Sequence, residues 1–209
     1  MDISLIETLR WEPQGGFVRL ERHLARLARS AAALGLAGSE EAEQALFAAL
    51  PPSALPVFPL RIRLELFADG RIDVQAIPFA PLAAGTVWRL KIADTRLSSA
   101  DPLLRHKTSR RADYAAARAE FPAADADEVL LLNEDGALCE GTITSLFLDD
   151  RTGILKTPPL ASGLLAGVLR EELLESGKAV EQILRPEDLA QGSVFVGNSL
   201  RGLIRGDLT

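Results

Sequence analysis

The chain has 209 residues and a formal net charge of −6, with 47% hydrophobic and 25% charged residues. This composition is typical of an ordinary soluble globular protein and argues against global disorder. The negative charge argues against nonspecific binding to nucleic acid, which needs a positive field. The length allows one large domain or two small ones.

Several other classes of protein are also disfavoured. Cys139 is the only cysteine, so the chain can form no intrachain disulfide and no cysteine cluster for zinc. The two histidines, His23 and His106, are too few for a typical histidine metal site, and we expect no metal. Residues 1–10 lack the apolar core of a signal peptide, and no window approaches 18 uncharged apolar residues. We therefore expect a cytoplasmic protein that does not enter a membrane.

Residues 1–80 are predicted to form a small N-terminal domain of strands and helices. Apolar residues at helical spacing predict a first helix, which Gly35 and Gly38 help to end. Ser39 fits the N-cap of a second helix, and Pro51 and Pro52 would stop it. In chain order, we predict strands at 3–11 and 17–20, helices at 22–36 and 39–50, and strands at 57–67 and 71–77. Asp69-Gly70 between the last two strands is a strong hairpin signal.

Residues 81–87 are predicted to link this domain to a second one at residues 88–209. The stretch 78–85 contains two prolines and reads as a linker. Beyond it, we predict strands at 87–92, 128–133, 138–148, 154–157, 180–184 and 194–196, with helices at 109–121 and 167–177. The whole pattern indicates an α+β protein in which helices pack on sheets.

Lys107 lies in the dense basic segment Leu104-Arg105-His106-Lys107-Thr108-Ser109-Arg110-Arg111. A lone lysine in such a segment usually belongs to a solvated basic turn. Alternatively, neighbouring cations lower a lysine pKa, and the free amine can then form an imine with an aldehyde. The segment alone does not decide between the two interpretations.

Three further segments allow both a structural and a functional interpretation. Glu140, in Cys139-Glu140-Gly141-Thr142, either lies in an ordinary bulged strand or holds a pyridinium nitrogen protonated. The glycine-bearing stretch 162–170 is either a plain helix start or an end that binds phosphate. Asn198, directly after an apolar strand, lies either in a surface turn or in a ligand-binding loop.

Taken in order, these segments resemble the class IV, fold type IV, family of pyridoxal-phosphate (PLP) enzymes. The resemblance also includes Ile6-Glu7-Thr8-Leu9-Arg10 and His23-Leu24-Ala25-Arg26-Leu27, and it extends to Arg201. The family includes branched-chain aminotransferases, D-amino acid aminotransferases and aminodeoxychorismate lyases. The resemblance implies a two-domain fold type IV enzyme, with a small N-terminal α/β sandwich domain and a larger C-terminal pseudo-barrel domain.

The resemblance also implies which residues bind the cofactor, pyridoxal 5′-phosphate. Lys107 matches the lysine that forms the Schiff base and shuttles a proton between substrate and cofactor. Glu140 matches the partner of the pyridine nitrogen, and Arg26 matches an arginine that binds the cofactor phosphate. The remaining matches lie near that phosphate: the backbone N–H groups of Val168 and Leu169, and the side chain of Asn198.

Candidate partners for the substrate carboxylates are arginines, because a guanidinium binds a carboxylate with two parallel hydrogen bonds. Arg63 aligns with an arginine that meets the substrate carboxylate in some transaminases, although an exposed strand arginine is an equally good interpretation. The other candidates are Arg10, Arg105 and Arg201.

The sequence departs from the family pattern at several places. Branched-chain aminotransferases have a tyrosine five residues after the lysine, where this chain has Ala112; Tyr114 stands seven residues after. Leu169 replaces the threonine that is often found in the phosphate loop. The usual leading hairpin is missing and the C-terminal part is short, so we expect that part of the pocket wall is absent.

We favour 4-amino-4-deoxychorismate lyase, which releases pyruvate and 4-aminobenzoate for folate synthesis, because the Lys107 and Asn198 segments look more like lyase-type members. A class IV aminotransferase for branched-chain or D-amino acids is the alternative, since it shares every cofactor residue. A non-enzymatic relative that binds a ligand is the alternative from another class. We also expect a homodimer, because the pocket in this family is completed by the partner subunit.

Overall fold

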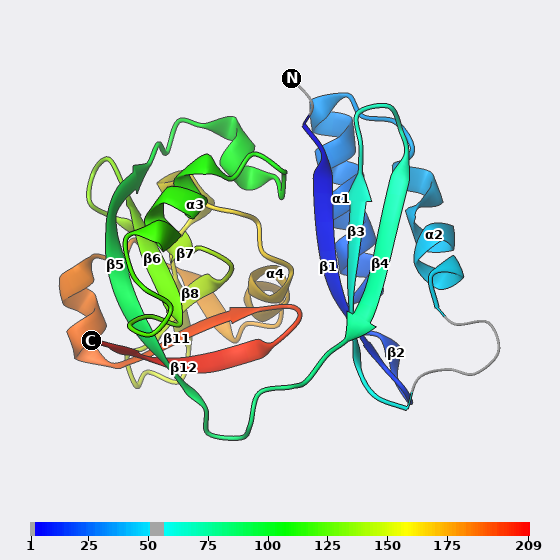
Figure 1. Ribbon diagram of the computed structural model, residues 1–209. Helices are drawn as coiled ribbons and strands as arrows, with labels where there is room; N and C mark the ends of the chain where they lie inside the picture. Colours follow the sequence, from blue (N-terminus) through cyan, green and yellow to red (C-terminus); the bar gives the residue numbers. More distant parts are fainter. Residues whose placement is uncertain (1–2, 51–56) are drawn as a thin grey trace. The chain divides into compact units, whose positions relative to one another are not determined.

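The computed structural model describes residues 3–50 and 57–209, and these divide into two compact units (Figure 1). The first unit comprises Met1–Pro81 together with His106–Arg110, and the second comprises Leu82–Arg105 and Arg111–Thr209. The segment around Lys107 therefore belongs to the first unit, whereas the predicted domain limits of 1–80 and 88–209 put it in the second. None of the helices within the described residues is long and apolar enough to cross a membrane.

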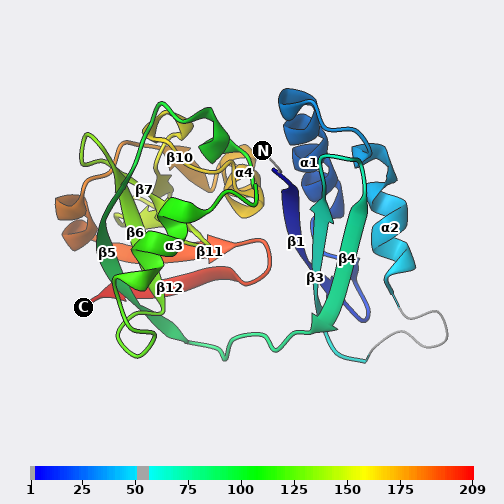
Figure 2. The same cartoon turned by 45° about the horizontal axis from the view of Figure 1, so that its top comes forward.

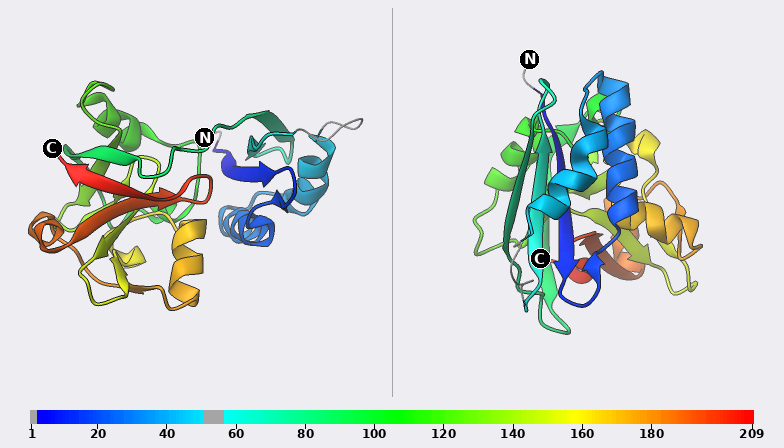
Figure 3. Two further views of the ribbon diagram at one scale, coloured as in Figure 1. Left: turned by 90° about the horizontal axis from the view of Figure 1, so that it is seen from below. Right: turned by 90° about the vertical axis from the view of Figure 1, so that its right-hand side faces the viewer.

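The first unit is a four-stranded antiparallel sheet covered by helices on one face (Figure 3). Its strand order is β2-β1-β3-β4, with α1 and α2 on the covered face. The elements are β1 (Leu5–Glu12), β2 (Gly16–Phe17), α1 (Leu20–Leu34), α2 (Ala42–Ala48), β3 (Leu60–Leu66) and β4 (Ile72–Pro78). Burial alternates strictly along β1 and β3, because successive side chains of a strand point to opposite faces.

Leucines from β1, β3 and α1 form the core of this unit. Leu9, Ile62 and Leu64 are fully buried, and Leu27 and Ala31 of α1 pack in the same cluster. Burying a leucine side chain stabilises the fold by about 1.5–3 kcal/mol, so this cluster holds the helix against the sheet.

Most of the predicted elements of the first unit are confirmed, but one strand and one helix differ. The strand predicted at 17–20 is only the two-residue β2, because α1 already begins at Leu20. Gly35 ends α1 with a φ of 70°, as its place after the apolar face predicted. The predicted helix at 39–50 is instead a 3-10 turn at Ser39–Glu41 followed by α2. Gly38 occupies the N-cap position with a φ of 91°, and Ser39, predicted as the N-cap, is the first residue of the 3-10 turn. Pro51 and Pro52, predicted to stop this helix, lie outside the described residues.

The second unit contains an eight-stranded mixed sheet that closes on itself. Its order is β10-β9-β8-β11-β12-β5-β6-β7, and an additional pairing of β7 with β8 closes the ring between Glu140 and Ser145. The strands are β5 (Val87–Leu97), β6 (Glu128–Asn133), β7 (Leu138–Gly141), β8 (Ser145–Asp149), β9 (Leu155–Thr157), β10 (Ala179–Glu181), β11 (Ser193–Asn198) and β12 (Gly202–Leu208).

One apolar cluster fills the inside of this ring. Leu90 of β5, Leu130 of β6, Leu146 of β8 and Val196 of β11 all belong to it, each at most a few per cent exposed. Outside the ring, α3 (Ala112–Ala119) contacts β5 and β6 (Figure 2), and α4 (Val168–Glu175) contacts β10 and β11. The second unit is therefore a small closed barrel with two helices on its outside.

The strand β12 was not predicted from the sequence. It contains Gly202 and Gly206, which weaken a strand signal. A Cβ at Gly206 would meet the side chain of Leu90, with its Cγ at 2.8 Å. The glycine is therefore required because β5 packs its core leucine against the backbone of β12.

Candidate active site

The segment that carries Lys107 pairs with the N-terminal half of β1. The Ile6 N–H donates to the Lys107 carbonyl oxygen at 2.8 Å, and the Ser109 N–H donates to the Ser4 carbonyl at 2.9 Å. Leu5 and Thr108 form an antiparallel bridge between these contacts. Because β2 pairs with β1 only near Trp11, this segment occupies an edge of the sheet that would otherwise be open. The backbone of Lys107 is thus held as part of the first unit.

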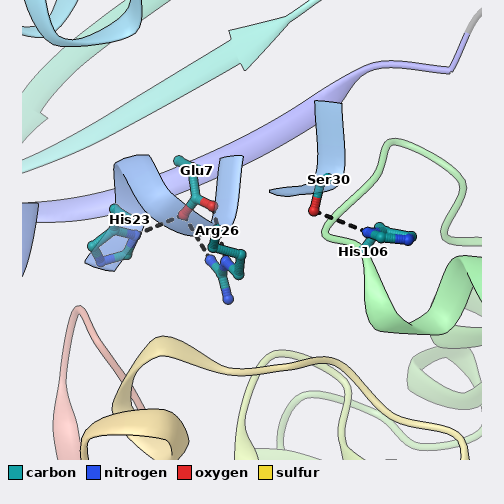
Figure 4. Close-up of polar contacts among 5 residues, drawn as sticks. All are labelled: Glu7, His23, Arg26, Ser30 and His106. Atoms are coloured by element: carbon teal, nitrogen blue, oxygen red, sulfur yellow. Dashed lines mark hydrogen bonds and ion pairs between the residues drawn. The ribbon is translucent and has the colours of Figure 1, made fainter. Parts of the chain in front are cut away.

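A side-chain contact attaches the same segment to α1. The Nδ1 atom of His106, which directly precedes Lys107, lies 2.9 Å from the hydroxyl of Ser30 (Figure 4). Ser30 is buried and His106 is half-buried, so this contact is partly shielded from water. Together with the pairing to β1, it fixes the segment from two sides.

Glu7, His23 and Arg26 form a buried charged cluster between β1 and α1 (Figure 4). The Arg26 guanidinium donates to both carboxylate oxygens of Glu7, from Nε at 2.8 Å and from Nη2 at 2.6 Å. His23 Nδ1 lies 2.6 Å from Glu7 Oε2. The three-residue spacing of His23 and Arg26 puts both on one face of the helix, where they meet the same carboxylate.

Electrostatics keep the Glu7 carboxylate ionised and disfavour the charged form of His23. Burial raises the pKa of Glu7, but the charge of Arg26 and the hydrogen bonds from His23 and Arg26 outweigh burial and lower the pKa to about 2. Burial lowers the pKa of His23, against the opposing effect of Glu7. Arg26 is therefore held in one orientation by a carboxylate that stays charged. Neither Glu7 nor His23 was assigned a role from the sequence, although the helical spacing of His23 and Arg26 was a usable signal.

Arg10 and Arg63 lie on the other face of this sheet. Arg63 stands opposite Thr8 in the register of β1 and β3, and Arg10 stands opposite Arg61. Arg63 donates to Glu65 Oε2 at 2.6 Å, and Arg10 Nε lies 2.9 Å from Glu12 Oε1. The structure thus brings these two substrate-binding candidates onto one face and Arg26 onto the opposite one.

In the second unit, Glu140 lies on β7 and is 4% exposed. Its Oε1 atom accepts a hydrogen bond from the Tyr114 hydroxyl at 2.6 Å and another from the Leu165 N–H at 3.0 Å. Burial, followed by the charge of Glu140 and the hydrogen bond to it, raises the pKa of Tyr114 above its ordinary value. Whether Tyr114 reaches a cofactor was open in the sequence; in the structure its hydroxyl is directed at this carboxylate.

The turn after Glu140 is built around the buried carboxylate of Glu128. Both carboxylate oxygens accept hydrogen bonds, and Glu128 is fully buried. The donors are the N–H groups of Val129, Thr142 and Ile143 and the hydroxyls of Thr142 and Thr144. Gly141 is needed because a Cβ there would meet the Glu128 Cδ atom at 2.7 Å. This network fixes the position at which β7 ends and β8 begins.

Asn198 bridges the same turn to the loop before β12. Its Nδ2 atom donates to the Ile143 carbonyl at 3.1 Å, and its Oδ1 atom accepts from the Arg201 N–H at 3.0 Å. The Arg201 guanidinium lies 5.9 Å from the centre of the Trp88 ring. The Asn198 amide thus holds two loops of the barrel, and its contact with a phosphate stays a prediction. Arg105 is exposed and ends a 3-10 turn in this unit.

The helix α4 begins at Val168, one residue after Gly167. The first bond of its i to i−4 ladder runs from the Glu171 N–H to the Gly167 carbonyl at 2.9 Å. The amides of Val168 and Leu169 therefore have no acceptor within the helix, as at every helix start. Both side chains are buried, so Leu169 contributes packing where the family often has a threonine hydroxyl.

Comparison with known proteins agrees with this fold and identifies the family. The family model for class IV amino-transferases matches residues 4–207. A protein of Schizosaccharomyces pombe, provisionally named an aminodeoxychorismate lyase, is 30% identical over 98% of this chain and 89% of its own length. A Thermotoga maritima protein, provisionally named a branched-chain-amino-acid aminotransferase, is 30% identical over 85% of this chain and 64% of its own.

A solved structure is also similar over the full length. The crystal structure of a Mesorhizobium loti protein, provisionally named an amino-acid aminotransferase, is 50% identical to this chain, with a TM-score of 0.94. The similarity covers 99% of this chain and 100% of the other. The chain therefore belongs to the class IV aminotransferase family of PLP-dependent enzymes.

Proposed function

We propose that Lys107 carries PLP in this protein and that the enzyme is a 4-amino-4-deoxychorismate lyase. The observation that carries the proposal is the attachment of Lys107 and Arg26 to one strand. Ile6 of β1 is bonded to the Lys107 backbone, and Glu7, the next residue, is bonded to the Arg26 side chain. One strand therefore holds the backbone of Lys107 and the side chain of Arg26, which supports the proposal that the two serve one cofactor.

The chemistry of the donor set fits PLP. The cofactor combines an aldehyde, a phosphate and a ring nitrogen that is basic. Lys107 would take the aldehyde, and Arg26 with the amides of Val168 and Leu169 would bind the phosphate, since both donor types favour anions. Glu140 would face the ring nitrogen, and Asn198 would support the loops near the phosphate.

The residues of this chain then have separate tasks in the reaction. Bound PLP supplies an electron sink for the negative charge that develops at the substrate Cα. The Lys107 amine would remove the Cα proton as a general base and, as a general acid, would give a proton to the departing enolpyruvate, which becomes pyruvate. Glu140, as a carboxylate, would keep a proton on the ring nitrogen. Arg201 would bind a substrate carboxylate, and Arg10 and Arg63, on the sheet face opposite Arg26, are the further candidates for this role.

The lyase assignment is supported by the relative named for that activity. The Schizosaccharomyces pombe protein aligns with nearly the whole chain and with 89% of its own length. In that reaction the amino substrate is cleaved to pyruvate and 4-aminobenzoate, which places the enzyme in folate biosynthesis. We also propose that it acts as a cytoplasmic homodimer.

A second candidate is an aminotransferase for branched-chain or D-amino acids. The specific observation in its favour is the 50% identity to the Mesorhizobium loti protein provisionally named an amino-acid aminotransferase. The two reactions differ in a measurable way. A lyase forms pyruvate and 4-aminobenzoate from aminodeoxychorismate without an acceptor, whereas a transferase removes an amino group only when a keto acid is supplied.

The test begins with protein that has been incubated with PLP and freed of excess cofactor. We expect a visible absorbance band in the wild type, its loss in Lys107→Ala, and its retention in Lys178→Ala, which removes an exposed lysine. Formation of pyruvate and 4-aminobenzoate without a keto acid supports the lyase. Turnover that requires 2-oxoglutarate or pyruvate would replace it with the transferase. A colourless protein that takes up no PLP would contradict both and support a non-enzymatic relative.

A further inference from the structure

Tyr114 is the only tyrosine in the chain, and its hydroxyl is directed at Glu140. It lies on α3, whereas Glu140 lies on β7, so the contact joins two residues that are 26 positions apart in the sequence. The distance of 2.6 Å is that of a strong hydrogen bond from a hydroxyl to an ionised carboxylate. The Leu165 N–H donates to the same oxygen at 3.0 Å.

The Tyr114 ring is itself held in place. The guanidinium of Arg111, one turn earlier in the chain, lies 4.2 Å from the ring centre. Arg111 also donates to the carbonyl oxygen of Thr142, in the turn that follows Glu140. On its other side, the ring packs against the apolar cluster that contains Ala117 and Cys139. The hydroxyl therefore reaches Glu140 from a fixed direction.

We propose that Tyr114 is a positioning residue for Glu140, and that its hydroxyl, with the Leu165 N–H, orients the carboxylate for the ring nitrogen of PLP. The inference rests on the proposed function, in which Glu140 is the partner of that nitrogen. Two donors on Oε1 restrict rotation of the carboxylate and stabilise its ionised form. An ionised carboxylate holds a neighbouring pyridinium nitrogen protonated, so removal of the Tyr114 hydroxyl weakens the effect of Glu140.

The single tyrosine allows the contact itself to be measured. Tyrosinate formation changes the near-ultraviolet absorbance, and in this chain the whole change comes from Tyr114. The titratable and charged groups that act on its hydroxyl are Glu140, Arg111 and Cys139. Burial raises the pKa of the Cys139 thiol to about 12, so the thiol stays protonated over most of the titration.

We expect no tyrosinate in the wild type before alkaline unfolding, and tyrosinate at a lower pH in Glu140→Gln, because the negative charge beside the hydroxyl has been removed. This measurement needs neither PLP nor a substitution at position 114. Ionisation of the wild-type tyrosine near the ordinary pKa of about 10 would overturn the proposal. The same conclusion would follow if Glu140→Gln left the titration unchanged.

A second measurement tests whether the contact acts on the cofactor. Tyr114→Phe removes the hydroxyl and keeps the ring beside Arg111. We expect its affinity for PLP to fall by about tenfold, the effect of losing one hydrogen bond to a charged group. The pH at which the visible band titrates should shift in the same direction as in Glu140→Gln. Because Tyr114 acts through Glu140, the double variant should behave as Glu140→Gln alone.

A matched control removes a hydroxyl that serves another glutamate in the same unit. Thr95 Oγ1 donates to Glu120 Oε1 at 2.5 Å, and Thr95→Val should leave both PLP affinity and the visible band unchanged. Wild-type affinity and spectrum in Tyr114→Phe, or additive effects in the double variant, would overturn the positioning role while leaving the proposed function intact. A wild type that binds no PLP would instead overturn the proposed function, and this inference with it.

Discussion

The backbone N–H of Ile6 and the carbonyl oxygen of Lys107 are joined by a hydrogen bond of 2.8 Å. The residue after Ile6 is Glu7, whose carboxylate binds the Arg26 guanidinium with two hydrogen bonds. The Lys107 backbone and the Arg26 side chain, which we assign to the cofactor site, are therefore bonded to adjacent residues of one strand. A change in β1 is expected to displace both.

Replacing Glu7 with glutamine should destabilise the protein strongly. The change removes the charge of the carboxylate that binds the buried Arg26, and removal of one member of a buried ion pair costs about 3–5 kcal/mol. Denaturant unfolding gives the change in the free energy of unfolding. Arg71→Ala breaks an exposed pair with Asp73 and serves as the control, with an expected loss of at most about 1 kcal/mol. Equal losses in the two variants would contradict the structural importance of the buried pair.

The stability of the protein should fall on acidification in a defined window. The pKa of Glu7 is lowered from 4.5 to about 2, so between these values the unfolded state binds more protons than the native state. The contribution of Glu7 is therefore complete above pH 4.5 and is lost as the pH falls towards 2. It amounts to about 3 kcal/mol. The pKa of His23 is also lowered, so the free energy of unfolding begins to decrease once the pH falls below 6.5, the ordinary pKa of histidine. The free energy of unfolding should change less with pH across this range in Glu7→Gln than in the wild type. An equally steep dependence on pH would contradict the low pKa of Glu7.

Ser30→Ala should loosen the segment that carries Lys107. The variant removes the hydroxyl that contacts His106 Nδ1, at a cost of about 1 kcal/mol. We expect faster hydrogen exchange at the Ile6 and Ser109 amides, which donate across the pairing of this segment with β1. Ser176→Ala, at an exposed serine, should leave these two amides unchanged. Unchanged exchange in Ser30→Ala would show that the backbone pairing alone holds the segment.

Gly141→Ala should disturb the turn beyond Glu140. The added Cβ would stand 2.7 Å from Glu128 Cδ and would also meet the Thr144 hydroxyl. We expect a loss of about 1–3 kcal/mol, the usual cost of overpacking, together with weaker PLP binding. In the exposed Gly15→Ala, the new Cβ makes only an ordinary contact of 3.7 Å, and the free energy of unfolding should stay close to that of the wild type. A stable Gly141→Ala with normal PLP affinity would contradict the requirement for glycine.

The oligomeric state can be measured directly. We expect sedimentation equilibrium to give twice the chain mass of 22.5 kDa, because we propose that a partner subunit completes the pocket. A monomer with full activity would refute this expectation.

Strong local signals made much of the fold predictable. The Asp69-Gly70 hairpin is confirmed, with Gly70 at a φ of 84° and the Asp69 carboxylate accepting from the Arg71 N–H. The buried strand at 128–133 was predicted to the residue, because four apolar residues, Val129–Leu132, run without interruption before a turn. By contrast, β12 escaped prediction, since its Gly206 is required by the side chain of Leu90 in another strand. A sequence shows the presence of such a glycine but not the neighbour that requires it.

The site could be predicted only in part. Ordered motifs indicated the family and the candidate residues, because the types and spacings of those residues are set by their chemistry. The partners of those residues were not visible in the sequence. Glu7 binds Arg26 from a strand, and Tyr114 reaches Glu140 from a helix, and both contacts arise only after distant elements have packed. The barrel-closing pairing of Glu140 with Ser145 likewise depends on the turn that Glu128 organises.

Assignment of residues 106–110 to the first unit means that the chain passes between the two units three times, after Pro81, after Arg105 and after Arg110. A single cut therefore cannot yield two intact halves. A fragment that ended at Pro81 would expose the open edge of β1, a surface that promotes self-association. The remaining fragment, residues 82–209, would contain the segment 106–110 with Lys107 but would lack β1, with which this segment pairs. Neither unit is expected to be prepared intact by truncation near residue 81.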